Sequence, residues 1–190
     1  DLMFKTLRNA FKVEDIRKKL LYTFFMLVVI RIGAQVPVPG ANIEAFQGFL
    51  ESMRTSAGDA WALFNAMTGG SFENLSIFAL SISPYITSSI IMQLLTIAIP
   101  KLEEMQNEGE SGRKKIQEIT RYVTVALAVV ESIAMAIGFG NQGVFGNVKA
   151  MSGMRYFFTM FTVVVTMTAG SAVLMWIGER ITEKGVGNGI

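Results

Sequence analysis

Residues 78–100 read FALSISPYITSSIIMQLLTIAIP and combine two properties that seldom occur together in one helix. The stretch is apolar and, at 23 residues, long enough to cross the roughly 30 Å hydrocarbon layer of a bilayer. It also carries hydroxyl and amide side chains, to which hydrocarbon offers no hydrogen-bond partner: Ser81, Ser83, Thr87, Ser88, Ser89 and Gln93. We therefore expect a membrane-spanning segment with one face against protein or a water-filled cavity.

The whole chain has the composition of a membrane protein. Of its 190 residues, 51% are hydrophobic and only 17% are charged, against about 25% charged in soluble domains. The absence of Cys and His from the sequence excludes disulfides, thiolate nucleophiles, Cys/His zinc sites and His-dependent catalytic triads. No nucleophile, metal-ligand cluster or acid pair is placed near an interface, so we predict neither an enzyme nor a bound cofactor.

The hydrophobic runs predict an all-α, polytopic membrane helix bundle. Residues 1–19 form an amphipathic interfacial segment in which apolar residues recur at helical spacing among Lys and Arg. Four spans are expected at 20–38, 75–97, 122–139 and 155–177. The segments between and after them are 39–74 with a short apolar helix at 59–70, the polar loop 98–121, the loop 140–154, and the terminal turn 178–190.

The distribution of Lys and Arg predicts the orientation. Residues 1–19 hold six of them, 33–74 hold one, and 97–121 hold five, whereas the two later non-spanning segments hold two each. By the positive-inside rule, the amino terminus and the 97–121 loop are cytoplasmic. Within that loop, Arg113, Lys114 and Lys115 form either a solvated cluster near anionic headgroups or a docking surface for a cytosolic partner, and the sequence leaves both open.

One stripe of the second span mixes branched apolar and polar residues. At about 100° per residue, Ile82, Ile86, Ser89 and Gln93 fall near one line of a continuous helix, and Leu80 and Leu94 fall on the opposite side. Ser and Thr commonly serve as contacts between packed helices. Alternatively, the stripe lines a water-filled cavity that Ile82 and Ile86 narrow.

Arg31 and Glu131 are the ionisable residues deepest in the expected spans. Their helical rises from the cytoplasmic starts of the spans are about 16 and 14 Å, so their depths match. Intramembrane charges are functional hypotheses by default. We predict that the two pair or share a buried polar network, which would leave no free titratable group for an ion-coupled carrier.

Four segments carry a resemblance to a known family. They are RIGAQVPVPG (31–40), SIFALSISPYITSSIIMQLL (76–95), EGESGRKKIQEITRY (108–122) and MWIGERITEKGVGNGI (175–190). In order and spacing, they closely resemble the SecY family, the pore-forming subunits of the bacterial Sec protein translocase. The resemblance implies the amino-terminal half of an inverted-repeat, protein-conducting channel of about ten spans, with a fifth span expected beyond Ile190.

The resemblance also implies roles for particular residues. Ile82 and Ile86 match the apolar constriction ring of the pore, and the stripe toward Ser89, Ile90 and Gln93 matches the lateral gate. The helix at 59–70 matches the plug, with Asp59 as a possible N-cap, Trp61, Phe64 and Met67 as its packing face, and Gly69-Gly70 as its flexible end. Glu131 stands where the resemblance leads us to expect an uncharged polar residue.

The function implied is the conduction of unfolded secretory polypeptides across the bacterial cytoplasmic membrane and of membrane segments laterally into it. The implied partners are the SecE and SecG subunits, the SecA ATPase, the ribosome, signal sequences, preproteins and lipids, with nucleic acid met only through the ribosome. The chain has no nucleotide-binding motif, which is consistent with a passive conduit. An inverted-repeat secondary transporter is the alternative interpretation, since it shares broken helices with such channels.

Overall fold

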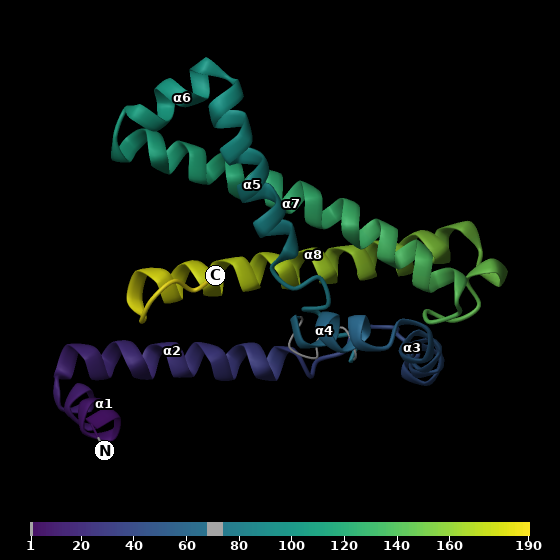
Figure 1. Cartoon of the computed structure of the whole chain (residues 1–190). Helices are drawn as coiled ribbons and strands as arrows, with labels where there is room; N and C mark the ends of the chain where they lie inside the picture. Colours follow the sequence, from purple (N-terminus) through teal and green to yellow (C-terminus); the bar gives the residue numbers. More distant parts are fainter. Residues whose placement is uncertain (1, 68–73) are drawn as a thin grey trace.

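The computed structural model describes residues 2–67 and 74–190, and this part of the chain is mainly α-helical. The helices are α1 (Leu2–Lys12), α2 (Glu14–Gly33), α3 (Ile43–Ala57), α4 (Asp59–Met67), α5 (Ser83–Ala98), α6 (Pro100–Asn107), α7 (Glu110–Asn141) and α8 (Gly153–Lys184), with a 3₁₀ turn at Val148–Ala150. The long helices α7 and α8 pack along each other, α2 packs on α8, and α5 crosses α7 (Figure 1).

A stripe of small residues on α7 brings its neighbours close. Every fourth residue is small and buried: Thr120, Thr124, Ala128, Ser132, Ala136 and Gly140. This spacing keeps the residues on one face, and small side chains let backbones approach. The Ser88 hydroxyl of α5 donates to the Thr120 carbonyl oxygen at 2.8 Å, and the Ser132 hydroxyl lies 3.3 Å from that of Thr168 on α8.

The second predicted span is helical only from Ser83. Residues 75–82 form turns, with left-handed φ angles of 44° at Leu75 and 55° at Ser81. Pro84 lies in the first turn of α5, where its missing N–H costs no helical hydrogen bond. The assumption of one continuous helix from Phe78 onward is therefore wrong before Ser83, because the proline marks a helix start rather than a helix interior.

Residues 36–38 and helix α8 hold the turn segment 75–82 inside the bundle. An antiparallel bridge joins Pro37 to Ser76, and the Ile77 N–H donates to the Val36 carbonyl oxygen at 3.0 Å. Gly170, near the middle of α8, allows this close approach, because a Cβ there would overlap the Ile77 carbonyl oxygen. The segment thus exchanges hydrogen bonds with the 36–38 strand-like stretch and packs against a bare patch of α8.

A proline also produces the sharp bend after α5. Ile99 is extended, with φ −108° and ψ 112°, and α6 leaves at 102° to α5. Proline disfavours helical geometry in the residue before it and favours the first turn of a new helix. The predicted loop 98–121 is therefore mostly helical: α6 and the first turns of α7 form a hairpin in which Gly112 packs against the Met105 carbonyl group.

Two of the described helices, α7 and α8, are long and apolar enough to span a membrane individually. The pair α5 and α6 meets the same criterion only together, across its bend. Helix α2 contains the apolar run predicted from residue 20 onward, but it starts six residues earlier with charged turns. The predicted interfacial segment 1–19 is consequently divided, since α1 ends at Lys12 and the residues from Glu14 onward join α2.

The elements rich in Lys and Arg gather at one end of the molecule. Figure 1 shows α1, the α6 hairpin and the carboxyl-terminal residues at one end, with α3 and the α7–α8 connection at the other. At that second end, the Phe46 and Phe49 rings of α3 pack edge-on against Phe139 of α7, with centroids 5.3 and 5.6 Å away. The charge distribution and the fold therefore give the bundle two chemically distinct ends.

Gly170→Ala should lower the thermal stability of the full-length protein, because the added Cβ must displace the backbone at Ile77. We expect a loss of about 1–3 kcal/mol. Gly138→Ala on α7 is the matched control, since its Cβ would meet nothing within 4 Å and alanine favours a helix over glycine. The measurement is the folded fraction of detergent-solubilised protein after heating, by size-exclusion chromatography. Equal stabilities of the two variants would contradict the close packing.

Candidate functional site

A cavity of about 550 Å³ lies where α4, the turn before α5, the start of α5 and the middle of α7 meet. Its walls are Phe64, Met67, Ala79, Leu80, Ser81, Ile82, Ser83, Ile86, Glu131, Ala134 and Met135. The cavity therefore brings together residues from three predicted groups: the plug, the constriction and the intramembrane charges.

Ile82 and Ile86 present one apolar wall of this cavity. Ile82 is the capping residue before α5, with φ −96° and ψ 6°, yet the Ile86 N–H still donates to its carbonyl oxygen at 3.1 Å. The two side chains thus keep helical spacing although the helix begins between them. Ile86 is 44% exposed in this chain, so its side chain is available to contact whatever occupies the cavity.

Helix α4 supplies another part of the wall. Trp61 is buried and its ring lies 6.2 Å from that of Phe64, whereas Phe64 and Met67 are exposed and line the cavity. The predicted packing face is therefore divided, with only Trp61 in the core. Asp59 is the first residue of α4, where the positive end of the helix dipole stabilises a negative charge. The predicted hinge residues Gly69 and Gly70 lie outside the described residues.

A second, polar groove of about 430 Å³ lies toward the basic end, between α5, α6 and α7. Its lining includes Ser89 and Gln93 of α5 and Arg113 of α7. Ile90, predicted at the same face, is 52% exposed and lies outside this lining. Lys114 and Lys115 are exposed on the first turns of α7, so the predicted basic cluster divides between groove and outer surface.

The polar residues of α5 serve two purposes. Ser88 and Thr96 are buried, together with Pro84 and Met92, at every fourth position. They belong to the helix-packing face, since α5 packs against α7. Ser89 and Gln93, which are less buried, line the polar groove, and Met92 and Thr96 of the packing face border it as well. Leu94 is 62% exposed, as expected for the opposite side, but Leu80 is buried, because it belongs to the turn segment rather than to the helix.

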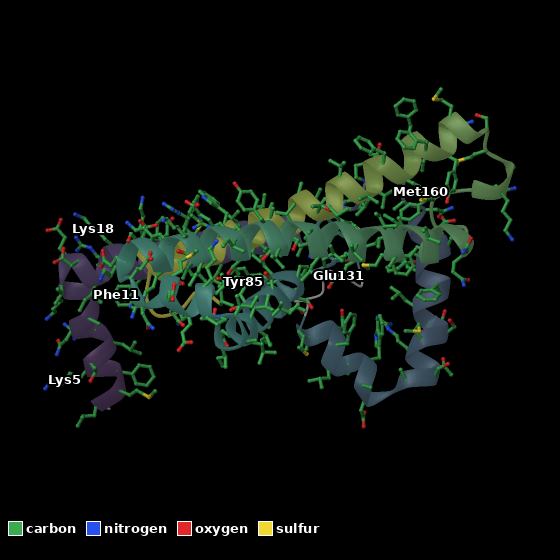
Figure 2. All side chains as sticks on the ribbon, turned by 90° about the horizontal axis from the view of Figure 1, so that it is seen from above. Lys5, Phe11, Lys18, Tyr85, Glu131 and Met160 are labelled. Atoms are coloured by element: carbon green, nitrogen blue, oxygen red, sulfur yellow. The ribbon has the colours of Figure 1, made fainter. Side chains whose placement is uncertain are left out.

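The structure does not bring Arg31 and Glu131 together as an ion pair. Arg31 lies in the last turn of α2, which packs against α8, while Glu131 lies on α7 at the cavity (Figure 2). Among the residues that the structure describes, Glu131 makes no ion pair. The prediction was based on equal depth, and depth alone does not determine which way each helix turns its side chains.

An ion pair that the sequence reasoning missed joins α7 to α8. Arg121, which precedes the apolar part of α7, donates from Nε and Nη2 to the two carboxylate oxygens of Glu179, at 3.0 and 2.9 Å. Only 12% of the Glu179 side chain is exposed. The sequence did offer a signal for this ion pair, because Arg121 and Glu179 flank neighbouring antiparallel spans at the same membrane face.

Removing the Arg121–Glu179 pair should destabilise the packing of α7 on α8. A double-mutant cycle with Arg121→Gln and Glu179→Gln should give a coupling energy of about 1–2 kcal/mol, since bidentate, partly buried pairs exceed exposed ones. The matched control is the exposed Lys18–Glu14 pair, whose coupling should stay at a few tenths of a kcal/mol. Thermal unfolding of the solubilised protein measures both cycles, and equal couplings would contradict this assignment.

The shared cavity predicts proximity between α4 and the start of α5. With Met67→Cys and Ile86→Cys introduced together into the resting full-length protein, a short bifunctional thiol reagent should join the two positions. Met67→Cys with Leu94→Cys is the control, because Leu94 lies two helical turns beyond Ile86, a rise of about 12 Å along α5, and outside the lining of the cavity. The sequence contains no cysteine, so the introduced thiols are the only ones in this chain. Equal crosslinking in the two pairs, read by gel mobility after protease cleavage, would contradict the described geometry.

Comparison with known proteins agrees with the order of these elements. A family model described as SecY matches residues 76–190. "Protein translocase subunit SecY" of Corynebacterium glutamicum is 46% identical over 183 residues, which cover 96% of this chain and 42% of that protein. The protein of the same name from Pseudomonas aeruginosa is 47% identical over 178 residues, covering 94% of this chain and 38% of that protein.

The likeness extends to a third bacterium. "Protein translocase subunit SecY" of Bacillus subtilis is 43% identical over 189 residues, covering 99% of this chain and 42% of that protein. The chain therefore spans less than half the length of the curated relatives it matches. Because the family model matches more than half of the chain and the relatives align over nearly all of it, this chain belongs to the SecY family.

Proposed function

We propose that this chain forms the amino-terminal half of the pore subunit of a Sec protein translocase in the bacterial cytoplasmic membrane. In this role it conducts unfolded secretory polypeptides across the membrane and releases membrane segments laterally into lipid. The observation that carries the proposal is the cavity that Phe64 and Met67 of α4 line together with Ile82 and Ile86. Its relatives are named as translocase subunits, which supports the same role.

The chemistry of the cavity suits a pore that accepts any polypeptide sequence. Isoleucine side chains make no hydrogen bonds, so Ile82 and Ile86 contact a passing chain without holding it at a specific position. A narrow apolar collar also excludes water and ions by dewetting when no chain is present. One half of such a collar is present here, and the second half of the pore subunit would complete it.

Helix α4 is suited to act as the movable plug of this pore. It has nine residues, and of its predicted packing residues only Trp61 is buried. Phe64 and Met67 are 46% and 74% exposed, so moving them costs little buried apolar contact. Elements with few buried contacts open at lower free energy than the core. Displacement of α4 would clear the cavity beside Ile82 and Ile86.

The lateral route would follow α5. Its side facing away from α7 is apolar and exposed at Ile86, Ile90 and Leu94, while the polar groove at Ser89 and Gln93 runs beside it. A signal sequence moving along α5 would therefore meet an apolar surface on one side and a hydrated groove on the other. Such a boundary would sort hydrophobic segments toward lipid and polar segments toward the pore.

The basic end of the bundle would lie in the cytoplasm. There, α1 exposes Phe4, Leu7 and Phe11 among Lys and Arg residues, which suits an interfacial helix on an anionic leaflet. The exposed Lys114 and Lys115 suit docking by the SecA ATPase or the ribosome. Exposed apolar residues of α2, among them Phe24 and Phe25, would contact lipid or the SecE and SecG subunits.

Site-specific crosslinking to a stalled secretory polypeptide tests the proposed pore. With Ile86→Cys or Ile82→Cys in the full-length protein, the stalled chain should become attached, because both side chains line the cavity. Leu94→Cys is the control, since that side chain is exposed but lies outside the lining of the cavity, about 12 Å further along α5 than Ile86. Attachment at Leu94 with none at either isoleucine would reject the pore assignment. The product is measured as a band that contains both proteins.

A further inference from the structure

Glu131 gives the cavity beside the isoleucines an unusual charge. Of the described residues that line it, Glu131 is the one ionisable group, and the others are apolar or carry small hydroxyls. The side chain is half-buried on α7 (Figure 2). Among the described residues no Lys or Arg forms an ion pair with it. The charge of the carboxylate is therefore directed into the cavity rather than cancelled across a helix interface.

The size of the cavity lets one carboxylate influence all of it. A cube of about 550 Å³ has an edge of about 8 Å, which matches the Debye length at physiological ionic strength. Apolar walls have a low dielectric constant and focus the field of a charge into the space between them. A single negative charge therefore raises the local concentration of cations throughout the cavity and lowers that of anions.

We propose that Glu131 makes this cavity selective for small cations over anions, so that a pore opened by displacement of α4 conducts cations preferentially. The consequence for conduction rests on the proposed pore function, whereas the charge preference of the cavity does not. Selectivity in channels commonly arises from side-chain carboxylates close to a constriction. Here the carboxylate lies in the same cavity as Ile82 and Ile86.

The first experiment measures the charge preference at Ile86 without requiring conduction. Ile86→Cys is introduced into the full-length protein, alone and with Glu131→Gln, and its reaction rates with a cationic and an anionic methanethiosulfonate reagent are compared. Glu131→Gln should lower the cationic-to-anionic rate ratio on the order of threefold to tenfold. Glutamine nearly preserves the shape of glutamate. Ile86→Cys with Glu103→Gln is the control, because Glu103 is an exposed carboxylate on α6, outside the cavity.

An unchanged ratio in the Glu131→Gln variant would overturn the inference, as would an equal change in the Glu103→Gln control. Failure of both reagents to reach the thiol of the Ile86→Cys variant would overturn it too, because a cavity closed to ions cannot select among them.

The second experiment separates this inference from the pore function. The translocase is reconstituted in planar bilayers, opened either by removing α4 or by Ile86→Ser, and its reversal potential is measured under a potassium chloride gradient. Glu131→Gln should shift that potential toward the value for chloride, while Glu103→Gln should not. A current with an unshifted potential would overturn the inference alone. The absence of current from both opened forms, with the rate ratio still dependent on Glu131, would overturn the pore function and leave the charge preference of the cavity standing.

Discussion

The hydrogen bonding of a non-helical segment in the middle of the bundle is the constraint on which the rest of this structure depends. Residues 75–82 do not form a helix, and only some of their backbone groups bond within the segment, as the Ala79 and Ser81 N–H groups do with the Ser76 and Phe78 carbonyl oxygens. The other groups need partners from elsewhere in the chain. The 36–38 stretch provides them through the Pro37–Ser76 bridge. Gly170 leaves the room that this arrangement requires. The interruption is thus tolerated because protein, not lipid, surrounds it.

This interruption creates the functional cavity. The helix begins only at Ser83, and Ile82 and Ile86 line the same cavity as Phe64 and Met67 of α4. Beyond that point the small residues of α7 hold α5 close through contacts such as Ser88 with Thr120. The start of the second span therefore lines the cavity, whereas the rest of it packs closely against α7.

Two acidic residues of the bundle are used in opposite ways. Glu179 on α8 is neutralised by a bidentate pair with Arg121, and the pair ties α7 to α8 near the basic end. Glu131, further along α7 than Arg121, lies at the cavity wall without an ion pair among the described residues. A buried pair contributes to packing, whereas an uncompensated carboxylate at a cavity imposes a field on what enters. The same residue type therefore stabilises one site and confers charge selectivity on the other.

The sequence by itself determined the membrane class, the apolar runs and the concentration of Lys and Arg in particular segments, because composition and local periodicity are properties of short windows. The sequence also showed the resemblance of four motifs to the SecY family, which assigned Ile82 and Ile86 to the same predicted constriction. Only the tertiary structure decided that α5 starts at Ser83, that Arg121 of α7 forms an ion pair with Glu179 of α8, and that Glu131 lies at the cavity. These depend on how each helix is rotated about its axis, and one residue of rotation is about 100°, which long-range packing sets and no local pattern records.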